Sequence, residues 1–195
     1  MDEDPRQTQD LESINRGLLI EELENAIGHY FADITDSCGY PYIQHCLYVG
    51  HRAAELSGRY YGDEGHREMA FVIGLCHDVY ENLRANEQQN VDNMLRRLYP
   101  DNAAYRQVKR WLDLLTHDPD ALTYAEYFER ITHSRMASLV KAADAHHNGT
   151  LSRWKFRLQT MTDKQACQIR KACGEYEGRS RKLIELLDNN RFEEA

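Results

Sequence analysis

Apolar residues recur along this chain at spacings of three and four positions, which is the period of an amphipathic helix, rather than at every second position. Glycine and proline, which interrupt helices, are sparse at 11 and 4 residues. The pattern predicts an all-α fold, a single helical bundle. We expect helices over residues 11–31, 41–57, 69–82, 91–99, 103–116, 124–131, 136–147 and 169–187.

The length of 195 residues fits one ordinary domain with its own hydrophobic core. No repeat, low-complexity tract or linker divides the chain. We therefore expect a flexible N-terminal segment at residues 1–10, one helical domain at 11–190, and a short C-terminal tail at 191–195.

Charge and composition narrow the classes of partner. The chain has 24 Lys and Arg against 32 Asp and Glu, a formal net charge of −8, so we expect neither nucleic acid nor an anionic membrane as a partner. No apolar run approaches the ~18 residues that span a bilayer. The acidic start, Met1–Pro5, lacks the pattern of a secretory signal, and we expect a cytoplasmic protein.

Five scattered cysteines form no C-x-x-C pair, so neither a disulfide framework nor a thiolate zinc site is expected. Buried free thiols are commonly inert core residues. A redox or nucleophilic role for one of them stays open.

The segment 69–82 is apolar almost all round, which predicts a helix at the centre of the bundle. His77 and Asp78 interrupt this apolar character. Burying an imidazole beside a carboxylate is costly unless something compensates for it. From spacing alone, the pair is either a hydrogen-bonded element of the core or part of a metal site.

Other ligands are available for such a site. His45 lies near the start of the second predicted helix, and Asp144 lies on another mostly apolar helical stretch. Two imidazoles and two carboxylates form a mixed nitrogen and oxygen set that suits a divalent first-row metal. A six-coordinate ion would keep positions for water and a phosphate oxygen.

Three sequence blocks carry a family resemblance. They are residues 41–45 (PYIQH), 77–82 (HDVYEN) and 141–148 (KAADAHHN). Their order resembles the HD-domain superfamily of metal-dependent phosphohydrolases, whose fold is an all-helical bundle. The similarity is closest to the Rel/SpoT-type hydrolases that remove pyrophosphate from the alarmone (p)ppGpp, and it spans roughly residues 25 to 185.

The resemblance implies a divalent metal, with Mn²⁺ expected, and the same ligands that the apolar helices indicate: His45, His77, Asp78 and Asp144. Glu81, one helical turn beyond the doublet, is expected to orient or deprotonate the attacking water. Asn82 stands where the family pattern has aspartate. An amide can position a water but cannot accept its proton, which predicts a less efficient proton transfer.

The resemblance also implies residues that bind the nucleotide. It places Asn148 against the nucleotide, and Thr150 approximates a family threonine. By spacing, Lys141 is the nearest cation for an anionic substrate, with Arg153 among further candidates. Tyr42 is the expected contact to the base, in a cluster with Tyr40 and Tyr48 that can stack a ring or simply belong to the core.

One departure affects the predicted base preference. Asp36 and Ser37 stand where the family carries basic residues that hold guanine. We therefore expect hydrolysis of (p)ppGpp or a close analogue with weak discrimination between bases.

Two other functions remain open at this stage. The first is hydrolysis of a different nucleotide phosphate ester, such as a nucleoside monophosphate. The second is a catalytically weakened domain that binds a nucleotide or regulates a partner, for which Asn82 is the main argument. A protein partner or a homo-oligomer also remains open.

Overall fold

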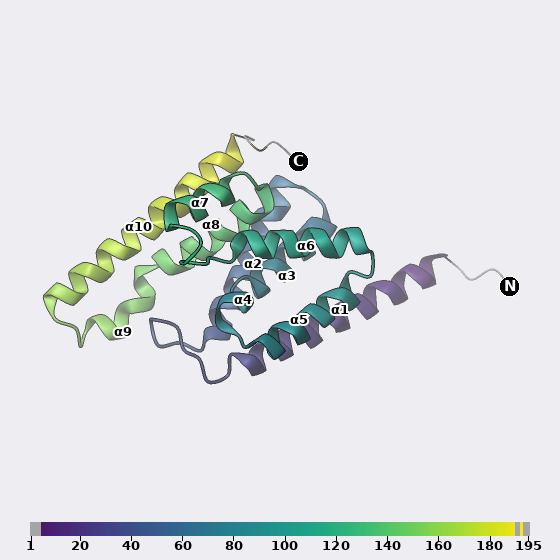
Figure 1. Ribbon diagram of the computed structural model, residues 1–195, viewed down its shortest axis with the longest axis horizontal. Coiled ribbons are helices and arrows are strands. Elements are labelled where there is room, and N and C mark those ends of the chain that lie inside the picture. Colours follow the sequence, from purple (N-terminus) through teal and green to yellow (C-terminus); the bar gives the residue numbers. More distant parts are fainter. Residues whose placement is uncertain (1–4, 190–191, 193–195) are drawn as a thin grey trace.

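The computed structural model describes residues 5–189 and 192, and within these residues it is an all-α, single-domain helical bundle without a strand, as predicted (Figure 1). One isolated antiparallel bridge joins Thr35 to Pro41. The elements in chain order are α1 (Pro5–Tyr30), α2 (Tyr42–Tyr60), α3 (Glu64–Cys76), α4 (Val79–Asn82), α5 (Ala85–Leu98), α6 (Asn102–Leu115), α7 (Tyr124–Thr132), α8 (Arg135–Gly149), the 3-10 helix η1 (Leu151–Trp154), α9 (Lys155–Leu158) and α10 (Asp163–Asp188).

Helices α2, α3 and α8 form the centre of the bundle. Helix α10 packs along α8 on one side, and α1 packs beside α5 on the other (Figure 1). The most apolar helix, α3, is buried from Ala70 through Cys76, which fits its nearly continuous apolar sequence. The candidate ligands His45, His77 and Asp144 therefore lie on or next to the central helices of the bundle.

Four helices begin five or six residues earlier than predicted, among them α3 at Glu64 instead of 69 and α10 at Asp163 instead of 169. Helix α1 begins at Pro5, so residues 5–10, expected to be flexible, are helical. Helix α5 begins at Ala85 rather than at 91, because the Glu87 carboxylate accepts a hydrogen bond from the Arg84 N–H at 2.9 Å and caps the first turn. The residues of that first turn are polar, so they do not show the apolar spacing from which a helix can be predicted. Residues 1–4 and most of the expected tail lie outside the described residues.

The predicted continuous helix 69–82 is wrong in one respect. The chain leaves α3 after Cys76 and starts again at Val79, so His77 and Asp78 form a turn between two helices. The His77 ring binds the carbonyl oxygen of Gly74, the group that Asp78 N–H would use in a continuous helix. Asp78 adopts φ −102° and ψ 2°, outside the helical well. A side chain competing for a backbone carbonyl interrupts the helix without glycine or proline.

Of the five cysteines, all free, Cys167 is exposed and the others are buried. Within the described part of the chain, no helix combines the length and apolar character needed to cross a membrane.

Candidate metal centre

Close packing of two helices brings the first two candidate ligands together. A three-residue connection joins α2 to α3, so the helices run antiparallel. They touch at Gly50 and Gly74, where a Cβ on Gly74 would lie 2.8 Å from the Gly50 Cα. His45 lies before the contact on α2, and His77 lies after it at the end of α3. The glycine contact therefore brings these two rings together, with their centroids 5.1 Å apart.

Helix α8 supplies the third ligand. It packs against both α2 and α3, and Asp144 is buried within it. One ligand atom from each of His45, His77 and Asp144 lies within 4.8 Å of the others. These three buried side chains can bind one divalent metal ion.

Asp78 completes the predicted set from the turn after α3. Its Oδ2 lies 3.4 Å from His45 Nε2 and 3.0 Å from His77 Nε2. Asp144 Oδ1 lies 3.4 Å and 3.9 Å from the same two nitrogens. The two Nε2 atoms are 3.2 Å apart. All four predicted ligands thus present an atom to one small volume.

The outer nitrogen of each imidazole has its own partner. His77 Nδ1 donates to the Gly74 carbonyl at 2.7 Å, which leaves its Nε2 unprotonated in the neutral ring. His45 Nδ1 lies 2.7 Å from His147 Nδ1. Desolvation, followed by the charge of His45, lowers the pKa of His147 to about 3, so His147 accepts this hydrogen bond as a neutral ring. Both ligand imidazoles are therefore oriented with Nε2 toward the centre, as outer partners orient metal ligands.

The two carboxylates and the Lys141 ammonium leave one negative charge in the centre as long as the imidazoles are neutral. Burial disfavours the charged form of His45, but its hydrogen bonds to the carboxylates of Asp144 and Asp78 outweigh this effect and raise its pKa to about 9. Burial also opposes ionisation of the carboxyl groups, yet neighbouring cations hold the pKa values of Asp78 and Asp144 below their usual range. A proton or a metal ion can balance the negative charge of the centre.

Three residues predicted to bind substrate contact the two carboxylates instead. Lys141 Nζ lies 2.7 Å from Asp144 Oδ2, and Asn148 Nδ2 donates to Asp144 Oδ1 at 2.6 Å. Tyr42 OH donates to Asp78 Oδ2 at 2.6 Å. These contacts fix the carboxylates as outer partners do in metal sites. A direct contact of Lys141, Asn148 or Tyr42 with a nucleotide stays a prediction.

Glu81 and Asn82 lie on the short helix α4, and both are exposed. Glu81 Oε1 accepts a hydrogen bond from the main-chain N–H of His117 at 2.6 Å. Desolvation raises the pKa of Glu81, although the His117 N–H opposes the rise. Asn82 Nδ2 turns back to the Asp78 carbonyl at 3.1 Å. The structure therefore orients Glu81 through the backbone of the loop at His117, whereas Asn82 is hydrogen-bonded to the backbone at the start of its own helix.

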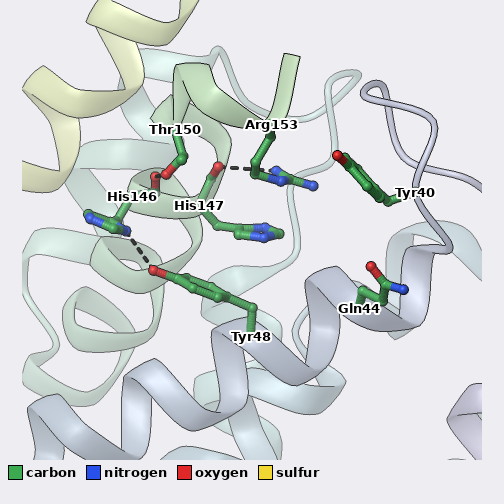
Figure 2. A pocket seen from close by; sticks show the side chains of 7 residues that line it. All are labelled: Tyr40, Gln44, Tyr48, His146, His147, Thr150 and Arg153. Carbon is green, nitrogen blue, oxygen red and sulfur yellow. Dashed lines mark hydrogen bonds between the residues drawn. The ribbon is translucent and has the colours of Figure 1, made fainter. Parts of the chain in front are cut away.

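A pocket of about 310 Å³ adjoins the centre, with His147 belonging to both (Figure 2). It is lined by Tyr40, Gln44, Tyr48, His146, His147, Thr150 and Arg153. The Tyr48 ring stacks on His147 at a centroid distance of 4.2 Å, and its hydroxyl lies 2.8 Å from His146 Nδ1. Thr150, a predicted substrate-binding residue, lines this pocket. Its hydroxyl donates to the His146 carbonyl at 2.8 Å.

Sequence reasoning assigned no role to His147 in the metal site and did not single out His117. His147 had a signal, because it follows Asp144 by three residues and so shares its helix face. His117 acts through its backbone, which no residue type reveals.

No protein-family model matches the chain, and comparisons with curated proteins and with solved structures give no significant match.

Proposed function

We propose that this chain is a metal-dependent phosphohydrolase of the HD-domain type that acts on a nucleotide, removing the 3′-pyrophosphate of (p)ppGpp or a related alarmone. The observation that carries the proposal is the convergence of two imidazole Nε2 atoms with carboxylate oxygens of Asp78 and Asp144. If His77 and Asp78 were only a hydrogen-bonded pair of the core, the pair would not need a second imidazole and a second carboxylate directed at the same point.

The donor set supports a first-row divalent ion, and we propose Mn²⁺. Two nitrogens and two carboxylate oxygens suit such an ion and leave coordination positions for other oxygen ligands. When bound, the ion would lower the pKa of a water molecule and polarise the scissile phosphate.

The protein groups around the ligands would keep the site in one arrangement. Lys141 occupies Asp144 Oδ2, which leaves Oδ1 facing the imidazoles. Tyr42 holds the Asp78 carboxylate by donating to Oδ2, the oxygen that also faces the imidazoles. Because these partners act on the ligands before any substrate arrives, the site would need little reorganisation on binding.

Glu81 is the proposed proton acceptor for the attacking water. Desolvation raises its pKa, and a more basic carboxylate is a better acceptor near neutral pH. The hydrogen bond from His117 N–H leaves the second carboxylate oxygen for this task. Asn82 has no such capacity.

The substrate class rests on the resemblance and on the pocket. Residues 41–45, 77–82 and 141–148 resemble the Rel/SpoT-type blocks, and the pocket beside His147 offers aromatic faces and polar groups suited to a nucleoside.

Hydrolysis assays on purified protein test the proposal. With Mn²⁺ we expect release of pyrophosphate from (p)ppGpp, loss of turnover with a chelator, and an adenosine counterpart cleaved within about tenfold of the guanosine nucleotide. If the protein hydrolysed only nucleoside monophosphates, the substrate would be another nucleotide phosphate ester and not an alarmone. Nucleotide binding without any turnover would make the chain a regulatory module.

A further inference from the structure

Arg153 gives the pocket a fixed positive charge. In the sequence it lies far from residues 36–37, where the family carries the basic residues that hold guanine. It follows α8 in the 3-10 helix η1 and lines the pocket beside His147 (Figure 2). Its side chain is 14% exposed, so it is largely shielded from bulk water. A shielded guanidinium interacts with an anion more strongly than a surface one does.

Two contacts hold this guanidinium in place. Nη1 donates to the His147 carbonyl at 3.1 Å, and Nη2 forms an ion pair with Asp36 Oδ2. An arginine has five N–H donors in a planar fork, so these two contacts leave donor capacity for a ligand. That fork matches phosphate geometry better than an ammonium does.

Asp36 belongs to a built turn rather than to a loose surface loop. Its Oδ1 accepts hydrogen bonds from Cys38 N at 2.8 Å and Tyr40 N at 3.1 Å. Gly39 has a φ of 92°, which favours glycine at this position. Asp36 therefore divides its two oxygens between the turn and Arg153.

This arrangement supplies positive charge to residues 36–37, where the family carries basic residues and this chain does not. The Asp36 carboxylate is paired with Arg153, and Arg157 Nη1 donates to the Ser37 carbonyl. Two cationic side chains from the segment that follows α8, Arg153 and Arg157, therefore contact the turn. A phosphate that enters the pocket meets a paired carboxylate and not an isolated one.

We propose that Arg153 binds a second phosphate group of the substrate, separate from the one hydrolysed at the metal centre, and that Asp36 limits the strength of this contact. The inference rests on the proposed function, because it places the scissile phosphate at the metal ligands. Among the substrates left open above, it favours nucleosides phosphorylated at two positions, such as the proposed alarmone, over nucleoside monophosphates.

Binding of two probes tests this inference without turnover. The probes are adenosine 3′,5′-bisphosphate and adenosine 3′-monophosphate, titrated calorimetrically into the Mn²⁺-loaded Glu81→Gln protein. We expect the bisphosphate to bind about tenfold more tightly, as expected for a charge-assisted hydrogen bond. Arg153→Gln should remove that preference while leaving the affinity for the monophosphate nearly unchanged.

Asp36→Asn is the matched variant. The amide oxygen still accepts the hydrogen bonds that form the turn, but the negative charge beside Arg153 is removed. The preference for the bisphosphate should therefore grow severalfold. Arg153→Lys keeps the charge and should retain part of the preference, which separates lost recognition from lost folding. An Arg153→Gln protein that keeps the full preference, or that loses both probes equally while its melting temperature is unchanged, overturns the inference.

Failure of the proposed function would look different. Hydrolysis would then be missing from the wild-type chain with every nucleotide, whether or not Arg153 sets the preference between the two probes.

Discussion

The buried ligand group and the short helix α4 meet at the turn of His77 and Asp78 but are built differently. His45, His77 and Asp144 are each less than 5% exposed, and side chains or backbone groups fix their orientation. Glu81 and Asn82 are exposed, and Glu81 is oriented by a single amide from the 116–123 connection. The difference predicts that the proposed metal affinity and the proposed turnover are separable. Metal affinity should depend on the packed helices, and turnover on the exposed side chains of α4.

The largest effect is expected in the buried group. Asp144→Asn removes a ligand charge, so the affinity for Mn²⁺ should fall by more than about 100-fold, since outer partners alone are worth roughly 10- to 100-fold. Calorimetric titration with MnCl₂ measures this loss. Asp92→Asn is the control, because Asp92 is also a partly buried carboxylate, bound by Tyr80 and Tyr105. Equal Mn²⁺ affinity in both variants would mean that Asp144 is an ordinary polar core residue.

The matching change in α4 should separate the two properties. Glu81→Gln keeps the shape and the acceptor for His117 N–H but cannot take a proton, so kcat should fall about 100-fold at saturating Mn²⁺. Metal affinity should stay at the wild-type value. His117→Ala is the control, because it keeps the main-chain donor. Unchanged turnover in Glu81→Gln would remove Glu81 from the reaction.

The same contrast explains what the sequence could predict. His77 and Asp78 interrupt one apolar segment and Asp144 lies on another, an anomaly visible without any structure. His45 joins them as a histidine near the start of another predicted helix and through the resemblance. The all-α class and most helix centres were visible in the three-and-four spacing. The break at His77 was not, because histidine is not a helix breaker like glycine or proline and acts here by binding the Gly74 carbonyl.

The supporting groups could not be predicted for a different reason. The Gly74 carbonyl and the His117 amide are backbone atoms, which every residue carries. Arg153 and Asp36 are 117 positions apart, and only the packing of η1 against the 36–40 turn pairs them. Sequence patterns report local periods and anomalous residue types, whereas these contacts depend on the tertiary fold.

A smaller effect is expected from the outer partner of His45. His147→Phe keeps an aromatic ring to stack on Tyr48 but removes the nitrogen that accepts from His45 Nδ1. His45 then loses the group that fixes its tautomer, and Mn²⁺ affinity should fall about tenfold. Tyr48→Phe keeps the stack and removes only the contact to His146, so its Mn²⁺ affinity should match the wild type. If both variants bind Mn²⁺ equally, the outer nitrogen of His45 does not need His147.

The smallest effect is expected at Asn82, the position where the resemblance raised doubt about proton transfer. Its amide is exposed and donates to the Asp78 carbonyl, so the side chain is directed to the backbone of its own helix. Asn82→Asp replaces that donor by a carboxylate, which the carbonyl repels and solvent accommodates. We expect kcat to change by no more than about twofold, or ~0.5 kcal/mol in the activation free energy. Steady-state rates at saturating Mn²⁺ measure it, with Glu81→Gln alongside as the variant that loses turnover. A rise of tenfold or more in Asn82→Asp would show that a second carboxylate on α4 reaches the reacting water, and turnover would then depend on two residues of α4 instead of Glu81 alone.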